Sequence, residues 1–282
     1  MNPPPVTKKE LLLFCFLSAA ILLSIFFLQI NNAKTEVVFC DVGQGDAAYM
    51  RIKNRFDILI DAGPDRSVLN CLGKYMPFWD RKIELAILTH PNSDHYNGFF
   101  EIINRYKIDN FLTIRTSATT QSYKKLVSEI MANKIPFRSI AQGDRLKLTK
   151  EDELIFFWPP KSFVSNDDND YSLVFLFEEV TDDHRFRLLF SGDASPFVMN
   201  RLLNQPLQNL TILKIPHHGS KNGLTVNFLE LAEPKVTVIS VGKNNLYGHP
   251  AKTVLELLKS KNVKIKRTDI NGNILFRPND FK

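Results

Sequence analysis

The clearest indication of the fold is the segment Leu85-Ala86-Ile87-Leu88-Thr89-His90-Pro91-Asn92-Ser93-Asp94-His95. Its first four residues form a short apolar run, which is typical of a strand buried on both faces. Imidazole and carboxylate side chains follow directly, in a loop framed by Pro91 and Gly98, and a helix is predicted from about 98 to 106. Because side chains at the ends of parallel strands meet at one edge of a sheet, this stretch predicts a site at that edge.

The alternation of strands, polar turns and helices continues along the rest of the chain. Further strands are predicted at 36–40, 47–52, 57–60, 111–114, 154–158, 172–178, 185–190, 211–215 and 236–241, followed by a closing strand pair. Helices are predicted at 68–76, 120–134 and 251–260, with shorter ones after Asp193 and Ser220. Strands that come first and helices that are interleaved later favour a layered α/β or α+β sandwich.

The composition excludes several other classes of protein. Apolar residues make up 44% and charged residues 23% of the 282 residues, so the chain can bury a core and is not disordered. Three cysteines are too few for a disulfide scaffold. Cys40 and Cys71 could pair outside the cell, or remain buried thiols. The net charge of +6 weakly favours binding to polyanions or to anionic membrane surfaces.

The first 33 residues differ from the rest. Residues 11–28 carry no charge, and with residues 29 and 30 the run is long enough to span a hydrocarbon core of ~30 Å. The run is longer than the apolar region of a signal peptide, which favours an uncleaved anchor over a cleaved signal. We therefore predict a cytoplasmic tip and transmembrane anchor at 1–33 and a globular domain at 34–282. Lys8 and Lys9 favour a cytoplasmic N-terminus and an extracytoplasmic domain on the cell membrane.

Five of the six histidines lie just past the end of a predicted strand, namely His90, His95, His217, His218 and His249. The sixth, His184, lies in a charged turn and is predicted to be solvated. Imidazole nitrogens and carboxylate oxygens are ligands that Zn²⁺ or Mn²⁺ accepts. Asp193 follows a strand and a glycine, and its two oxygens could bridge two ions. Asp94 could instead cap the helix that follows it.

Other chemistries are disfavoured by missing motifs. Gly43-Gln44-Gly45 suggests a phosphate loop, but no Gly-x-Gly-x-x-Gly or Gly-Lys-Ser/Thr follows it. The sequence also lacks a Gly-x-Ser-x-Gly nucleophile elbow. Lys214 and Lys221 could attract a polyanion, although a lysine on a strand is usually solvated. The pooled histidines and aspartates therefore favour metal-dependent hydrolysis.

Taken together, these segments resemble the metallo-β-lactamase superfamily and, more narrowly, the C-terminal domain of the ComEC family of competence proteins. The matching segments lie at 41–47, 61–63, 89–98, 169–172, 190–193, 213–220, 247–250 and 268–272. The resemblance implies a four-layer αβ/βα sandwich with a metal site on its upper edge. It assigns metal binding to five residues and places His249 beside the substrate. The five are His90, Asp94, His95, Asp193 and His217.

The chain departs from the superfamily pattern at two points. Asn92 stands where His-x-His-x-Asp-His has its second histidine, and His184 is the sole histidine between His95 and Asp193. The resemblance still implies one ion held by Asp94, His95, Asp193 and His217. A second, looser ion could use His90 and Asp193, and the many oxygen ligands suit Mn²⁺ as well as Zn²⁺.

The residues and the resemblance together predict hydrolysis of phosphodiesters by a sequence-tolerant DNA nuclease linked to DNA uptake. DNA, the membrane at residues 11–30 and competence-type channel proteins are the expected partners. Asp94 would hold a proton of the attacking water or bind the ion, and His218 or His249 could protonate the leaving group. Two other functions stay open, because a fold does not fix a substrate. One is a phosphoesterase acting on small or cell-wall phosphate esters, and the other is a degenerate DNA-binding module.

Overall fold

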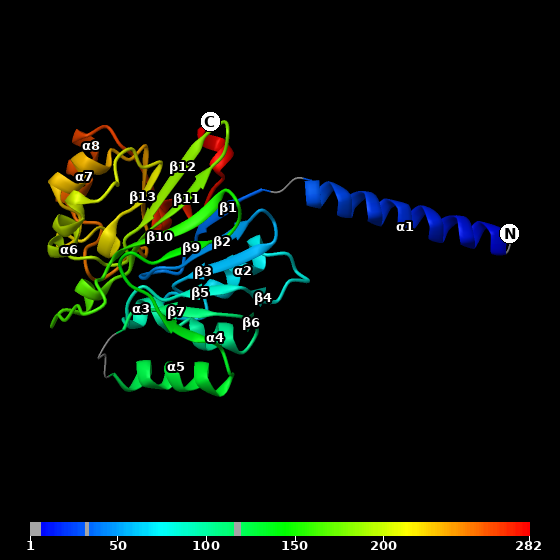
Figure 1. Ribbon diagram of the computed structural model, residues 1–282, viewed down its shortest axis with the longest axis horizontal. Helices are drawn as coiled ribbons and strands as arrows, with labels where there is room; N and C mark the ends of the chain where they lie inside the picture. Colours follow the sequence, from blue (N-terminus) through cyan, green and yellow to red (C-terminus); the bar gives the residue numbers. More distant parts are fainter. Residues whose placement is uncertain (1–6, 32–33, 116–119) are drawn as a thin grey trace.

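The computed structural model describes residues 7–31, 34–115 and 120–282, and for residues 26–31 it describes the backbone alone. Two seven-stranded sheets form the centre of the domain (Figure 1). In spatial order, the strands of the first sheet are β16 (Ile274–Phe276), β1 (Glu36–Phe39), β2 (Ala48–Ile52), β3 (Phe56–Ile60), β5 (Leu85–Ile87), β7 (Phe111–Thr113) and β8 (Phe137–Ser139). Those of the second are β15 (Lys264–Arg267), β14 (Val236–Ile239), β13 (Ile212–Lys214), β12 (Arg185–Phe190), β11 (Val174–Val180), β10 (Asp152–Trp158) and β9 (Arg145–Lys147). The short strands β4 (Lys82–Ile83) and β6 (Lys107–Ile108) pair separately.

Helices cover the outer face of each sheet, which gives four layers (Figure 1). The first sheet packs against α2 (Val68–Tyr75), α4 (Phe99–Ile103) and α5 (Gln121–Ala132). The second packs against α6 (Pro196–Arg201), α7 (Val226–Ala232) and α8 (Lys252–Ser260). Two four-residue helices, α3 (Ser93–Tyr96) and α9 (Thr268–Asn271), complete the set of labelled helices in the described domain. The predicted αβ/βα sandwich is confirmed.

Alternation of side chains along the strands explains why both faces of each sheet are apolar. In β1, Val37 and Phe39 face the core between the sheets, whereas Val38 packs toward the helices. In β12, Leu188 faces the same central core and Leu189 faces α6 to α8. Successive side chains of a strand point to opposite faces, so a strand covered on both sides needs a continuous apolar run.

The parallel strands fix the place where a site can form. In the first sheet β3, β5, β7 and β8 run parallel, and in the second β12, β13, β14 and β15 do so. The carboxyl ends of each group therefore lie along one edge, which we call the rim. The loops that carry most of the predicted site residues leave the strands at this rim.

The predicted closing strand pair is wrong. β15 pairs with β14 in the second sheet, whereas β16 pairs with β1 in the first. Ile274 and Phe276 lie in the core between the sheets, so burying them draws β16 away from its neighbour in sequence.

The prediction of a solvated His184 is also wrong, because its side chain is 8% exposed and its Nε2 lies 3.2 Å from Glu179 Oε1.

Cys40 and Cys71 form a disulfide, which settles the alternatives left open by the sequence. Their Cα atoms lie 5.7 Å apart, and the bond ties the end of β1 to α2 across a separation of 31 residues. Both residues are buried in the core between the first sheet and its helices. The bond therefore fastens the strand that leads to the first rim loop.

Replacing both cysteines by alanine should lower the free energy of unfolding by about 4 kcal/mol, because the unfolded chain regains the entropy of a 31-residue loop. Urea denaturation of the purified protein measures this change. A Cys15→Ala variant is the control, since Cys15 is a free, exposed thiol. Equal stability of the double variant and the wild type would show that the bond constrains little.

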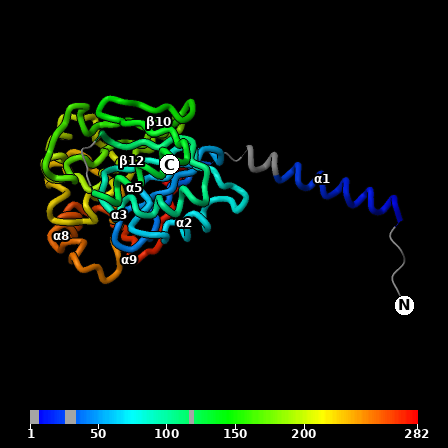
Figure 2. The backbone as a smooth tube through the Cα atoms, turned by 90° about the horizontal axis from the view of Figure 1, so that it is seen from below, coloured from blue at the N-terminus to red at the C-terminus, as the bar shows by residue number. Residues whose placement is uncertain are grey.

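The helix α1 (Lys8–Asn31) precedes the sandwich and lies apart from it (Figures 1 and 2). Its large apolar side chains between Leu11 and Ile25 are exposed. Among the residues whose side chains are described, no helix combines the length and apolarity needed to cross a membrane. The predicted span 11–30 ends in residues 26–30, whose side chains lie outside the described ones.

Candidate metal centre

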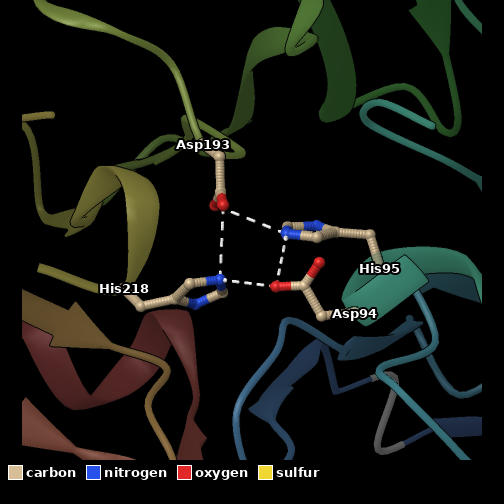
Figure 3. Close-up of side chains that lie close together, drawn as sticks. All are labelled: Asp94, His95, Asp193 and His218. Atoms are coloured by element: carbon tan, nitrogen blue, oxygen red, sulfur yellow. Dashed lines mark hydrogen bonds and ion pairs between the residues drawn. The ribbon is translucent and has the colours of Figure 1, made fainter. Parts of the chain in front are cut away.

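Four side chains meet at the rim, and Figure 3 shows them pointing toward one another. Asp94 and His95 come from α3, Asp193 follows β12, and His218 comes from the turn after β13. One donor atom of each lies within 4.8 Å of the others. His218 Nε2 is 3.1 Å from Asp94 Oδ2 and 3.3 Å from Asp193 Oδ2, and His95 Nε2 is 3.4 Å from Asp193 Oδ1. Residues more than a hundred positions apart thus share one site, which we call the rim cluster.

The outer hydrogen bonds of the two imidazoles fix which nitrogen faces the cluster. His218 Nδ1 lies 2.9 Å from Ser240 O, and because a carbonyl can only accept, Nδ1 carries the proton. His95 Nδ1 lies 2.8 Å from Asp61 Oδ2, and Asp61 also accepts from the backbone nitrogen and hydroxyl of Thr89. Each ring therefore presents Nε2 to the aspartates. Proteins orient imidazole ligands of metals in this way.

Charge in the rim cluster is balanced by protons on its histidines. Burial alone would lower the pKa of His95 and of His218, but Asp193 and the other nearby carboxylates outweigh burial and raise the pKa of both well above the usual value. Burial likewise opposes the charge of Asp193, yet His218 and His95 hold its pKa well below the usual range. A divalent ion could take the place of these protons without changing the balance of charge much.

The donor atoms fit such an ion. His95 Nε2 and Asp193 Oδ1 are buried and, apart from their ion pair with each other at 3.4 Å, have no hydrogen-bond partner among the described residues. Unpaired buried polar atoms are rare in folded proteins because desolvation without a partner is unfavourable. Two imidazole nitrogens and two carboxylates form a ligand set that Zn²⁺ and Mn²⁺ both accept. The rim cluster can therefore hold a cation on chemical grounds.

The other predicted site residues surround the rim cluster. His90 is fully buried, its ring centre lies 4.2 Å from that of His95, and burial lowers its pKa to about 3. The ring of His217 lies 6.2 Å from that of His218 and 5.9 Å from that of His249. The structure therefore places His218 in the position that the resemblance gave to His217.

The backbone conformation determines that His218, and not His217, joins the rim cluster. His217 and His218 both have positive φ angles, 52° and 53°, so the chain turns sharply after Pro216. This turn places the Nδ1 of His218 against the carbonyl of Ser240 at the end of β14. The sequence motif contains both residues and carries no signal that distinguishes them.

The glycine turn before Asp46 has a structural role. A Cβ atom on Gly45 would lie 2.3 Å from the carbonyl oxygen of Asp94, so the close approach of the two loops requires glycine. The backbone nitrogen of Asp46 then donates to that same oxygen at 3.2 Å. This loop thus holds α3 in place, and this contact explains the glycine turn without a role in phosphate binding.

Comparison with solved structures shows the class of fold. The chain matches YhfI of Bacillus subtilis, a metallo-β-lactamase fold protein, with a TM-score of 0.56 and 11% identity, over 86% of this chain and 99% of that one. Zn²⁺-bound PqqB of Methylobacterium extorquens gives a TM-score of 0.57 at 11% identity, with the same coverage. The chain therefore has the metallo-β-lactamase fold, as the resemblance implied.

Sequence relatives narrow the resemblance to competence proteins. The chain is 26% identical to ComE operon protein 3 of Bacillus subtilis over 271 residues, which cover 90% of this chain and 34% of that protein. It is 26% identical to Recombination protein 2 of Haemophilus influenzae over 96% of this chain and 33% of that protein. It is 27% identical to Competence protein ComA of Neisseria gonorrhoeae over 85% of this chain and 32% of that protein. The predicted resemblance is confirmed, and the chain spans about a third of the length of these curated relatives. No family model matches it.

Proposed function

We propose that this chain is a metal-dependent phosphodiesterase that cleaves DNA without sequence preference during DNA uptake. The rim cluster carries the proposal, because it joins four metal-type ligands, and two of their buried donor atoms have no hydrogen-bond partner among the described residues. The names of the competence relatives supply the link to DNA. Contacts to phosphate carry no sequence information, so a centre that acts on phosphate should tolerate any sequence.

In the proposed centre Asp94, His95, Asp193 and His218 hold the ion. A bound divalent ion would polarise the phosphate and acidify water. Asp94 is the most exposed of the four, with 33% of its side chain accessible, so its carboxylate is placed to accept a proton from attacking water. Both nitrogens of His218 are engaged, which assigns it to ligation rather than to protonation of the leaving group.

His249 and His217 flank the approach to the rim cluster in this proposal. Burial and the neighbouring His218 lower the pKa of His249, so its imidazole is neutral near pH 7 and suited to hydrogen-bond a substrate oxygen. His217 Nδ1 is buried without a partner among the described residues. The two rings, 5.9 Å apart, would orient the phosphate before cleavage.

The proposal also places the domain outside the cytoplasm on a membrane anchor. The apolar run at 11–30 supports the anchor, and Lys8 and Lys9 before it favour a cytoplasmic N-terminus. The disulfide Cys40–Cys71 supports an oxidising compartment for the domain. We propose that competence-type channel proteins are partners of this domain in moving the DNA.

Purified full-length protein in detergent tests the function. It is freed of metal, reloaded with Mn²⁺ or Zn²⁺, and given linear DNA, plasmid DNA and bis(p-nitrophenyl) phosphate. We expect cleavage of all three, loss of cleavage with a chelator and recovery on adding the ion. Turnover of the small ester alone would favour the phosphoesterase, and DNA binding without cleavage would favour the binding module.

Ion binding should weaken steeply as the pH falls. Because the pKa values of His95 and His218 are raised in the metal-free protein, both rings hold protons around neutral pH and must release them to bind an ion. Affinity should therefore fall by up to about a hundredfold per pH unit while two protons compete. Calorimetry in buffers of different ionisation enthalpy counts the protons released, and affinity independent of pH would contradict this coupling.

A further inference from the structure

A buried lysine lies directly beneath the rim cluster. Lys214 ends β13, is 3% exposed, and its Nζ donates to the carbonyl of Gly192 at 2.7 Å. The same ammonium forms an ion pair with Asp46 and lies 3.6 Å from Asp193 Oδ1. The prediction that this lysine is solvated is therefore wrong. Its charge is enclosed by carboxylates, since an unpaired ammonium is strongly disfavoured in a protein interior.

These carboxylates would otherwise form a second place for an ion. Asp46, Asp61 and His95 each offer an atom within 4.8 Å of the others, which is close enough to bind a cation. Most of their atoms are already engaged, however. Asp61 accepts from Thr89 and faces His95 Nδ1, while Asp46 Oδ2 pairs with Lys214. Asp46 Oδ1 lies 3.3 Å from His218 Nδ1 and has no hydrogen-bond partner among the described residues.

The space beside these groups is also small. The cavity that Asp46, Asp61, Thr89 and Lys214 border measures about 10 Å³. That volume holds about one water molecule. The ammonium thus supplies the positive charge that these buried carboxylates require.

The outer side of the cluster offers a poor second site as well. Asn92, where the superfamily pattern has a histidine, donates from Nδ2 to Asn169 Oδ1 at 3.3 Å. A neutral amide bonded to another amide therefore stands where the pattern has an imidazole. His90 is fully buried and its Nε2 has no hydrogen-bond partner among the described residues, but His90 with Asp193 makes a sparse ligand set.

We propose that the Lys214 ammonium is a fixed internal cation that takes the place of a second divalent ion, so that the centre holds one ion per chain. The inference rests on the proposed metal-dependent function and specifies the composition of its site. Lys214 acts here as a positioning residue, because it holds the carboxylates of Asp46 and Asp193 and lies behind the ligands.

The number of ions in the full-length wild-type chain is the first test. Metal-free protein in detergent is titrated with Mn²⁺ and examined by native mass spectrometry, with metal content checked by elemental analysis. One ion per chain at saturation is expected. Two ions of comparable affinity would overturn the proposal while leaving the hydrolase function intact, whereas the absence of any bound ion would overturn both.

The second test removes the ammonium. A Lys214→Met variant should bind the first Mn²⁺ about tenfold more tightly or take up a second ion, because the carboxylates lose their fixed counter-charge. Its metal-free form should also melt at a lower temperature. A Lys264→Met variant, which removes an exposed lysine from the neighbouring part of the same sheet, is the matched control.

A paired variant separates charge from packing. Asp46→Asn combined with Lys214→Met removes both members of the ion pair and keeps the net charge of the site. It should bind one ion with nearly wild-type affinity. If Lys214→Met alone binds one ion with unchanged affinity, the ammonium does not act as a cation of the site. Should that variant fail to fold, the wild-type count decides.

Discussion

An Asp193→Asn variant should bind Mn²⁺ at least about a thousandfold more weakly and lose phosphodiesterase activity by a similar factor. The change keeps the size of the side chain but removes the charge shared by His95 Nε2 at 3.4 Å and His218 Nε2 at 3.3 Å. The Lys214 ammonium also loses one of its carboxylate neighbours. Calorimetric affinity and the initial rate with bis(p-nitrophenyl) phosphate measure the two losses.

The matched control is Asp183→Asn, which removes an aspartate that is 79% exposed in the β11–β12 hairpin. That variant should behave as the wild type in both assays. If Asp193→Asn kept wild-type affinity and rate while the protein remained folded, the rim cluster would not be the metal centre, and the proposed function would lose its support.

Replacing the adjacent histidines His217 and His218 one at a time should have different effects on Mn²⁺ affinity. His218→Ala should weaken Mn²⁺ binding by about a hundredfold or more, because an imidazole that faces Asp94 and Asp193 is removed. His217→Ala should leave affinity within about threefold of wild type and reduce turnover instead, since its ring lies 6.2 Å from that of His218. Metal titration and steady-state kinetics of both variants decide the matter. The opposite pattern would return the ligand role to His217.

The central strands and the layers of the fold can be predicted from the sequence, because a strand that is buried on both faces has a continuous apolar run of residues. Runs such as Leu85–Ile87 admit no polar residue when helices and a second sheet cover them. β8 and β9 lack a continuous apolar run, because they lie at sheet edges and their side chains are largely exposed. Pairing of β16 with β1 depends on contacts between residues far apart, which no local pattern encodes.

The site is predictable in outline for the same reason. Ligands after parallel strands converge on the rim, and three of the four clustered residues were among the predicted metal ligands. What the sequence does not contain is the direction of each side chain. The positive φ angles at His217 and His218 select one ring, and the fold turns Lys214 inward toward Asp46. Both outcomes depend on contacts between residues that lie far apart in the chain.

The four side chains of the rim cluster come from both halves of the sandwich. Asp94 and His95 stand on the half built on the first sheet, and Asp193 and His218 on the half built on the second. An ion bound by all four residues would link the two halves of the domain. Because it would bind the folded state alone, it would stabilise that state against separation of the halves. The proposed cation would then also lower the rate at which a protease cleaves the domain.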